Sequence, residues 1–256
     1  MKVFVCLKQV PARDSVLKLD EAGQWVRDPD LTHEVNEPDA FALEEALRLK
    51  EKHGGEVVVV SAGPARAASA IREALAKGAD RGLHVEDQGL ARADSFVTAR
   101  ALAAAIRRET FDLVLTGLQS DDLGFGQTGV VLAQLLGVPH ATLIMEVQRL
   151  ENNIQVKREL EAGWFQRLQM PLPALLTIQS GINKVRYATL MGIKKAKTKE
   201  LKRLTPAELG VDLTPSQAIR RVYPPQKSKQ TQLIEGPAKQ AAAALIEKLR
   251  FEARIL

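Results

Sequence analysis

Residues 117–126 form a polar, glycine-rich stretch that follows the short apolar run 113–115. The run predicts a buried strand. From Thr128 the apolar spacing becomes helical, and Gly137 follows as a helix stop. A glycine loop between a strand and a helix start directs free N–H groups and the positive helix end toward one point, which favours an anion. We therefore expect a phosphate group at this loop.

Residues 124–129 match the dinucleotide pattern G-x-G-x-x-G letter for letter. The match is weak evidence, because it follows the fourth main predicted strand and no carboxylate for a ribose stands about 20 residues on. The loop offers Ser120, Gln127 and Thr128 as neutral hydrogen-bond donors, but no lysine of the kind found in a P-loop. This composition favours holding a nucleotide over transferring a terminal phosphate.

Other reactive residue types are sparse. Asp121 and Asp122 could bind a metal, but we expect them to hold backbone N–H groups, with Asp122 within reach of a ligand hydroxyl. The four histidines lie far apart, without metal-ligand spacing. Cys6 falls in a predicted buried strand near the rim of the sheet and is expected in the core. The sequence predicts neither a metal site nor a catalytic centre.

Alternating strands and helices must position the loop. Strands are predicted over residues 2–9, 56–61, 81–85 and 113–116; helices are predicted from an N-cap at Asn36 to a stop at Gly54, over 65–77 and 94–110, and from Thr128. This order is typical of an α/β fold with a doubly wound, mostly parallel, Rossmann-like sheet. Ligands of such sheets bind at the carboxyl ends of the strands. The loops after the first, second and fourth strands should therefore converge, with Asn36 nearby.

The second half of the chain has a different pattern. Strands over residues 141–149, 154–160, 164–170 and 174–179 suggest added antiparallel structure. Residues 181–205 lack an amphipathic period and are interpreted as an extended basic arm. Pro224 begins a linker, and residues 237–251 predict a terminal helix. We expect a nucleotide-binding domain over 1–180, a basic recognition arm over 181–205, and a C-terminal arm and helix over 206–256 that dock on another subunit.

Positive charge is concentrated in one segment. The chain carries a net charge of +5, but residues 184–203 alone carry +7, which leaves −2 for the rest. The lysines follow an apolar stretch, with Tyr187, Leu190, Met191 and Ile193. Apolar anchors rimmed by charge are typical of a protein docking site, because the anchors give affinity and the charges speed encounter.

The compartment is expected to be cytoplasmic, in a bacterium or archaeon. Cys6 is the single cysteine, which excludes an internal disulfide. No apolar run is long enough to cross a membrane. Strand-like sequence begins at Lys2, which leaves no room for a leader peptide.

Several stretches together resemble the beta (small) subunit family of electron-transfer flavoproteins. They are K-Q-V at 8–10, N-E-P-D at 36–39, E-E-A-L-R-L-K-E-K at 44–52, V-S-A-G-P at 60–64, A-L-A-K-G-A-D-R-G at 74–82, the loop 117–129, and a signature over 156–177. Residues 186–197, R-Y-A-T-L-M-G-I-K-K-A-K, resemble the family's partner-recognition loop and are called the recognition segment below. Ala162 departs from the signature, and Phe125-Gly126 replaces the usual polar or cysteine pair.

The resemblance implies an adenine-nucleotide alpha-hydrolase-like fold, a heterodimer with an alpha subunit, FAD in the cleft between the two, and structural AMP in this chain. It implies AMP contacts at Cys6, Asn36, Glu37, Pro38, Asp39, Ala62, Gly117, Leu118, Gln119, Ser120, Asp121, Asp122, Leu123, Gly124, Phe125, Gly126, Gln127 and Thr128. Leu190 would anchor an acyl-CoA dehydrogenase, with Tyr187, Met191 and Ile193 beside it. Electrons would pass to a membrane quinone oxidoreductase, so the chain would be an electron-carrier subunit rather than an enzyme.

Three alternatives remain open at this point. Some relatives hold a second FAD in place of AMP and bifurcate electrons. A free-standing adenine-nucleotide-binding regulator of the universal-stress type would be monomeric and colourless. A nucleic-acid-binding protein would use the lysines from Lys194 onward, and its binding would be sensitive to salt.

Overall fold

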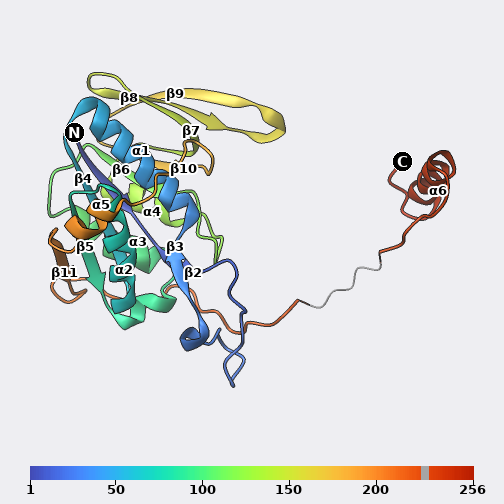
Figure 1. Ribbon diagram of the computed structural model, residues 1–256, viewed down its shortest axis with the longest axis horizontal. Helices are drawn as coiled ribbons and strands as arrows, with labels where there is room; N and C mark the ends of the chain where they lie inside the picture. Colours follow the sequence, from blue (N-terminus) through green and yellow to red (C-terminus); the bar gives the residue numbers. More distant parts are fainter. Residues whose placement is uncertain (226–230) are drawn as a thin grey trace.

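The computed structural model describes residues 1–225 and 231–256 and is built around a nine-stranded sheet (Figure 1). The strands lie in the order β11-β5-β4-β1-β6-β10-β7-β8-β9. Their bounds are β1 Lys2–Cys6, β4 Glu56–Gly63, β5 Arg81–Glu86, β6 Leu113–Gly117, β7 His140–Arg149, β8 Asn153–Glu159, β9 Phe165–Pro171, β10 Ala174–Ile178 and β11 Leu201–Leu204. From β11 to β7 all neighbours are parallel. The predicted doubly wound, mostly parallel fold is confirmed.

The order of the strands reverses between β1 and β6. The chain runs outward from β1 through β4 and β5 on one side, then returns to β6 and β10 on the other. A crevice forms at the carboxyl ends of the two strands that flank such a switch point, because the following loops turn in opposite directions. Here those ends are Cys6 and Gly117.

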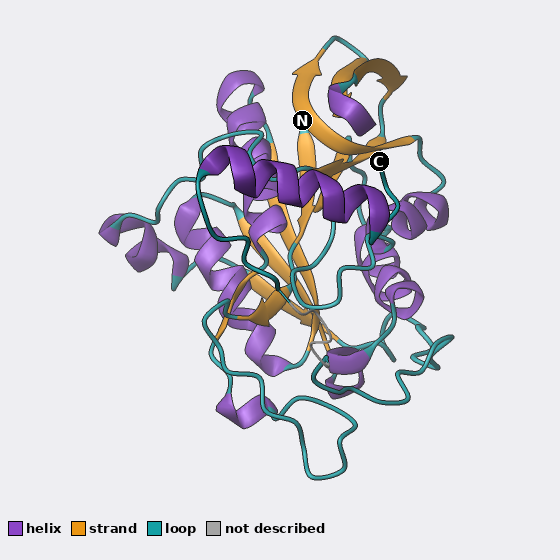
Figure 2. Ribbon diagram, turned by 90° about the vertical axis from the view of Figure 1, so that its right-hand side faces the viewer, coloured by secondary structure: helices purple, strands orange, loops and turns teal. Residues whose placement is uncertain are grey.

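Helices cover both faces of the sheet, as Figure 2 shows. Helices α1 (Glu37–His53) and α2 (Ala68–Lys77) pack on one face, and α3 (Ser95–Ile106) and α4 (Thr128–Leu136) on the other. Alternation along β1 matches this layering: Val3 and Val5 face the first pair of helices, whereas Phe4 and Cys6 face the second. Strands buried on both faces explain the continuous apolar runs in the sequence.

The first strand and the following segment differ from the prediction. β1 ends at Cys6, and Gln9 begins a separate strand β2 (Gln9–Pro11) that pairs with β3 (His33–Val35). The predicted hairpin over residues 17–26 is reduced to a single bridge between Leu19 and Val26. The segment also contains the 3₁₀ turn η1 (Asp28–Asp30). Similar turns interrupt the chain at η2 (Ala65–Ala67), η3 (Gln88–Arg92) and η4 (Glu161–Gly163). The helix predicted to start at Ala65 therefore becomes α-helical only at Ala68.

Only part of the second half is antiparallel. β8 and β9 pair antiparallel with their neighbours, but β10 and β7 are parallel to β6 and to each other. β10 lies between β6 and β7 and is buried over its full length. The expectation that all four strands were an antiparallel addition was wrong for β7 and β10, because residue spacing reveals a strand but not its partner or direction.

Residues 181–205 do not form an extended arm. They include a short helix α5 (Leu190–Ala196) and the edge strand β11, which pairs with β5. Gly192 permits the docking of α5, since a Cβ at this position would lie 2.3 Å from the Ala76 carbonyl oxygen of α2. The arm prediction was wrong because backbone pairing and close helix contact, rather than an apolar stripe, hold this segment.

The C-terminal part extends away from the sheet. Residues 206–225 run along the domain, and α6 (Ala238–Phe251) stands apart from it in Figure 1. The helix has no buried residue and exposes Leu245, Ile246 and Phe251. The linker expected from Pro224 continues into residues 226–230, outside the described residues. Among the helices that the structure describes, none is long and apolar enough to cross a membrane.

Candidate functional site

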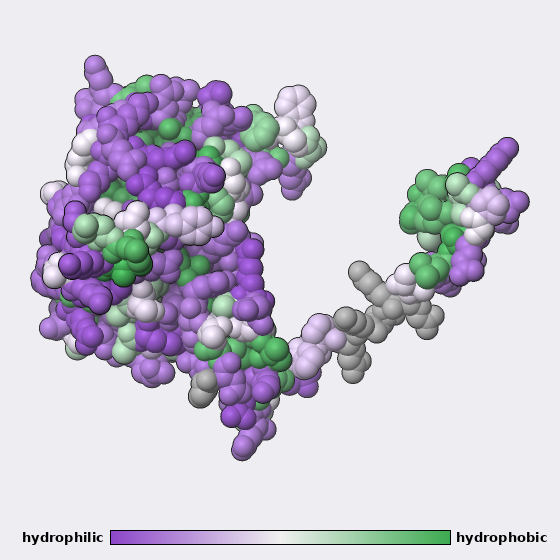
Figure 3. Space-filling view, in the orientation of Figure 1, coloured by the Kyte–Doolittle hydropathy of each residue, from purple (hydrophilic) through white to green (hydrophobic). Residues whose placement is uncertain are grey.

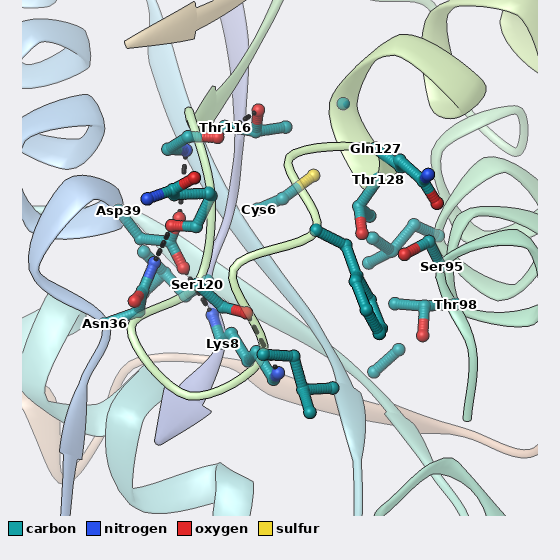
Figure 4. A pocket seen from close by; sticks show the side chains of 18 of the residues that line it. Cys6, Lys8, Asn36, Asp39, Ser95, Thr98, Thr116, Ser120, Gln127 and Thr128 are labelled. Carbon is teal, nitrogen blue, oxygen red and sulfur yellow. Dashed lines mark hydrogen bonds between the residues drawn. The ribbon is translucent and has the colours of Figure 1, made fainter. Parts of the chain in front are cut away.

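A pocket opens at the switch point of the sheet (Figure 4). It lies at the carboxyl ends of β1, β4 and β6, so the predicted convergence of the three loops is confirmed. Thirteen of the expected site residues line it: Cys6, Asn36, Asp39, Ala62, Gly117, Leu118, Gln119, Ser120, Leu123, Phe125, Gly126, Gln127 and Thr128. Glu37, Pro38, Asp121, Asp122 and Gly124 are outside its lining; Asp121 and Asp122 line a neighbouring groove instead.

The start of α4 presents backbone donors to this pocket. Gln127 occupies the N-cap position but makes no side-chain capping hydrogen bond, and the Val131 N–H donates to the Gln127 carbonyl. The preceding N–H groups of the first turn have no partner within the helix by geometry. Gly129 lets this turn approach the sheet, because a Cβ there would lie 2.6 Å from Thr177 Cγ2 and 2.8 Å from Thr116 Oγ1. The helix start is therefore available to an anion.

Asn36 acts on the loop rather than on its own helix. Asn36 occupies the predicted N-cap position of α1, but its side chain makes no capping hydrogen bond to that helix. Instead, Nδ2 donates to the Gln119 carbonyl at 3.0 Å, and Oδ1 accepts the Asp121 N–H at 2.9 Å. Asp121 Oδ2 in turn accepts the Glu37 N–H at 3.2 Å, at the first turn of α1. One hydrogen-bond network therefore joins the start of α1 to the loop after β6. The sequence could not predict it, because the two segments are more than 80 positions apart.

Asp39 joins the two strand ends at the bottom of the pocket. Its carboxylate accepts the Lys8 N–H at 2.7 Å and the Gly117 N–H at 2.9 Å. Burial raises the pKa of Asp39 to about 7, although both backbone donors oppose the shift. Burial and the nearby Asp39 also raise the pKa of the Cys6 thiol, so Cys6 is a neutral wall residue. Asp39 therefore positions the two strand ends, and Cys6 forms part of the pocket wall.

Asp122 holds a backbone N–H, as expected of the acidic pair, and also forms an ion pair that was not predicted. Its Oδ1 accepts the Leu123 N–H at 2.8 Å and lies 2.6 Å from Lys8 Nζ. Burial alone would raise the pKa of Asp122, but the Lys8 ammonium and the hydrogen bonds outweigh it and lower that pKa. Among the described residues there is no group of three or more His, Cys, Asp or Glu side chains able to hold a metal ion.

Sequence reasoning missed one wall of the pocket. Ser95 and Thr98 from the first turns of α3, Leu90 and Ala93 from the preceding loop, and Lys8 after β1 all line it. In Figure 4 Ser95 and Thr98 lie across the pocket from Asn36 and Asp39. A signal was present, since the predicted helix over 94–110 follows a predicted strand of the same sheet and must begin at the same edge. Lys8 supplies the basic side chain of the pocket from just after the end of β1, outside the glycine loop 117–129.

The start of α3 is also tied to the C-terminal segment. Asp94 caps α3 through the Val97 N–H at 2.8 Å, and its other oxygen accepts the N–H groups of Ser216 and Gln217 at 2.5 and 2.9 Å. Burial would raise the pKa of Asp94, but these donors outweigh it and lower that pKa. Residues 219 and 222 then line the neighbouring groove. The C-terminal segment therefore runs past the mouth of the site.

The recognition segment is exposed at its tip and fixed at its base. Tyr187 and Leu190 are 92% and 87% exposed, and Met191 and Ile193 are also exposed. Figure 3 shows hydrophobic atoms at the surface over α5. At the base, Arg186 pairs with Glu44 at 2.8 Å and Glu51 at 2.5 Å on α1. The expected docking residues thus lie together on a firmly held projection.

The carboxyl end of the recognition segment is fixed through α2. Arg72 Nη1 donates to the Ala196 and Lys199 carbonyls at 2.7 and 2.8 Å. Lys199 Nζ, just beyond the segment, donates to the Leu75 and Ala79 carbonyls at 3.0 and 2.5 Å. Cations near a helix C-terminus stabilise its last carbonyls. Lys199 and Arg186 are therefore used inside the domain, whereas Lys194 and Lys195 remain exposed.

Fold and site together define a doubly wound α/β protein with a pocket at its switch point and a short helix whose exposed tip is apolar. Residues 25–209 match the family model described as electron transfer flavoprotein domain. The chain is 39% identical to the electron transfer flavoprotein subunit beta of Methylophilus methylotrophus, over 96% of this chain and 97% of that one. Identity is 38% to the human protein of that name, over 89% and 91% of the two chains, and 33% to that of Bacillus subtilis, over the full length of both. The chain belongs to the family of electron transfer flavoprotein beta subunits.

Proposed function

We propose that this chain is the beta subunit of a heterodimeric electron-transfer flavoprotein and has no catalytic residues of its own. FAD, held mainly by the alpha subunit at the interface, supplies reversible electron uptake and release. Electrons come from acyl-CoA and other dehydrogenases, as in fatty acid beta-oxidation, and leave to a membrane quinone oxidoreductase. The observation that carries the proposal is family membership over nearly the whole chain. A cytoplasmic location is part of the proposal.

AMP is the proposed ligand of the switch-point pocket. The uncapped start of α4 and the hydroxyls of Ser120 and Thr128 suit a phosphate. Apolar lining from Ala62, Leu90 and Leu102 suits an adenine ring. The acidic Asp39 already accepts two backbone N–H groups, and burial raises its pKa. The role of AMP in this scheme is to stabilise the loops around the pocket.

The recognition segment is the proposed contact for dehydrogenases. Leu190 begins α5 and is almost fully exposed, with Tyr187 and Met191 beside it. Exposed lysines at 194 and 195 surround this tip. When such an apolar side chain becomes buried in a partner and charged residues surround it, a few residues supply most of the binding energy. Nothing in this role requires nucleic acid, and the charge of the segment is partly neutralised by Glu44 and Glu51.

The C-terminal arm and α6 are the proposed contact for the alpha subunit. The apolar side chains of Leu245, Ile246 and Phe251 are exposed on α6, where Figure 3 shows a hydrophobic surface. A helix with an unpaired apolar face needs a partner surface to contribute stability. Docking on the alpha subunit would supply that surface and would not require insertion into a membrane.

Co-expression with the gene of the alpha subunit tests the proposal. The yellow complex is purified, denatured, and its released nucleotides are quantified by chromatography and mass spectrometry. We expect one FAD and one AMP per heterodimer. A colourless monomer with adenine nucleotide would instead support a free-standing regulator, and two FAD per heterodimer would support an electron-bifurcating protein.

A further inference from the structure

A second groove continues from the switch-point pocket. Five residues line both cavities: Lys8, Ala62, Leu90, Ala91 and Leu123. Lys8 is the only charged side chain among these five. The groove extends under residues 12–33 and is also lined by Trp25, Arg66, Asp121 and Asp122. A ligand longer than the pocket could therefore grow into this groove only past Lys8 and its partners.

The ion pair between Lys8 and Asp122 stands at this junction. Lys8 Nζ lies 2.6 Å from Asp122 Oδ1 and donates to Ser120 Oγ at 3.2 Å. The backbone of Lys8 is fixed on both sides, because its N–H donates to Asp39 and its carbonyl accepts the Asn36 N–H. In Figure 4 the side chains of Lys8 and Ser120 lie beside each other. The side chain therefore extends from a fixed point to the loop that carries the anion donors.

The charges around the pocket favour few negative charges on a ligand. Among the described residues that line it, Lys8 and Asp39 alone are ionisable as cation or carboxylic acid. The charge of Lys8 is already matched by Asp122, whose lowered pKa keeps it ionised at neutral pH. One phosphate can be held by neutral N–H and hydroxyl donors. A second phosphate near the junction would meet the Asp122 carboxylate, and Asp121 also lines the adjoining groove.

We propose that the Lys8–Asp122 ion pair limits the pocket to nucleoside monophosphates by closing its junction with the second groove. This inference rests on the proposed AMP site and adds the residues that decide ligand length and charge. Lys8 bridges the junction between β1 and the loop, and Asp122 repels a further phosphate. Dinucleotides are excluded because their second phosphate would have to pass the Asp122 carboxylate at this junction.

The test uses purified heterodimers, wild type and with single substitutions, from which bound AMP has been removed, titrated calorimetrically with AMP, ADP and ADP-ribose. Asp122→Asn keeps the size of the side chain and frees the Lys8 ammonium, so ADP and ADP-ribose should gain affinity relative to AMP by about tenfold. Lys8→Met leaves the Asp122 carboxylate unopposed, so the same ratio should move in the opposite direction. Opposite signs separate the proposal from a general loosening of the loop, which would weaken all three ligands together.

A matched control removes an exposed ion pair far from the pocket, Lys157 with Glu146, which are 3.0 Å apart. The double substitution Lys157→Ala/Glu146→Ala should leave the affinity ratios at their wild-type values. Unchanged ratios in both junction variants, or shifts of the same sign, would overturn the proposal. If the wild-type heterodimer binds none of the three nucleotides, the proposed AMP site itself is wrong, which is a different result.

Discussion

The switch-point pocket and the recognition segment expose different kinds of group, polar donors in one and apolar side chains in the other, but similar polar and charged contacts hold both in place. In the pocket, backbone N–H groups and buried polar side chains face a cavity between strand ends. On the recognition segment, large apolar side chains face solvent. Both are held by charged or polar groups: Asp39 and Asn36 fix the pocket, and Arg186 and Lys199 fix the segment and its end. In both regions, charged and polar side chains mainly position the backbone, although the two surfaces differ in what they expose.

A consequence is that the two regions should respond differently to substitution. In the pocket the positioning groups are part of the core, so damage should reduce both stability and nucleotide content. At the tip of the recognition segment the side chains contact little of their own chain, so damage should affect docking alone. The following variants test this distinction in order of decreasing effect on stability.

Gly129→Ala should have the largest effect. The added Cβ would lie 2.6 Å from Thr177 and 2.8 Å from Thr116, so α4 must move away from the sheet. Overpacking of this kind costs about 1–3 kcal/mol. We expect a lower free energy of unfolding in denaturant titrations and loss of bound AMP. Gly137→Ala is the control: it lies at the other end of α4 in open space with a positive φ, and it should cost less and leave the AMP content unchanged.

Arg186→Ala should come next, and it addresses the base of the recognition segment. The substitution leaves Glu44, whose side chain is only 5% exposed, without its main partner. Loss of a partner for a buried charged group costs about 1–3 kcal/mol. Both stability and dehydrogenase coupling should fall. Lys195→Ala removes the same charge from an exposed position and should leave stability unchanged; equal losses in the two variants would contradict a positioning role for Arg186.

The pH dependence of stability should report on Asp39. Burial raises its pKa from an ordinary 3.8 to about 7. Between these values the folded protein binds a proton that the unfolded chain lacks, so this group's contribution to stability falls as pH rises from about 4 to about 7. The slope is at most about 1.4 kcal/mol per pH unit. The free energy of unfolding, measured by denaturant titration at several pH values, should fall more steeply with rising pH in the wild type than in Asp39→Asn. Equal slopes in the two proteins would rule the contribution out.

Leu190→Ala should have the smallest effect on stability and a large effect on docking. The side chain is 87% exposed, so the free energy of unfolding should change by less than about 0.5 kcal/mol. Loss of an interface anchor typically costs about 2 kcal/mol of binding. Electron transfer from the dehydrogenase should slow while FAD and AMP stay bound. Normal electron transfer in this variant would refute the docking role of the recognition segment.

Much of the pocket could be predicted from the sequence. The apolar run before the loop, the glycines, and the helix start at Thr128 each have a local physical cause, namely strand burial, backbone freedom and helix periodicity. Thirteen of the residues expected there line the pocket because parallel strands place their carboxyl ends at one edge. The exposed tip around Leu190 could also be predicted from the sequence. Its apolar residues are followed directly by lysines, which keeps the segment at the surface.

Tertiary structure decided what these local rules could not. Pairing direction depends on which strand ends up adjacent, so β7 and β10 were assigned to the wrong arrangement. The basic segment became α5 and β11 because an open edge of β5 and the carbonyls of α2 were available to it. The Asn36 side chain bonds the loop rather than the helix that it precedes, and Lys8 pairs with Asp122, which is 114 positions away in the sequence. Sequence periodicity indicates which side of each helix or strand is buried. Hydrogen bonds and ion pairs between distant residues form only when the fold brings those residues together.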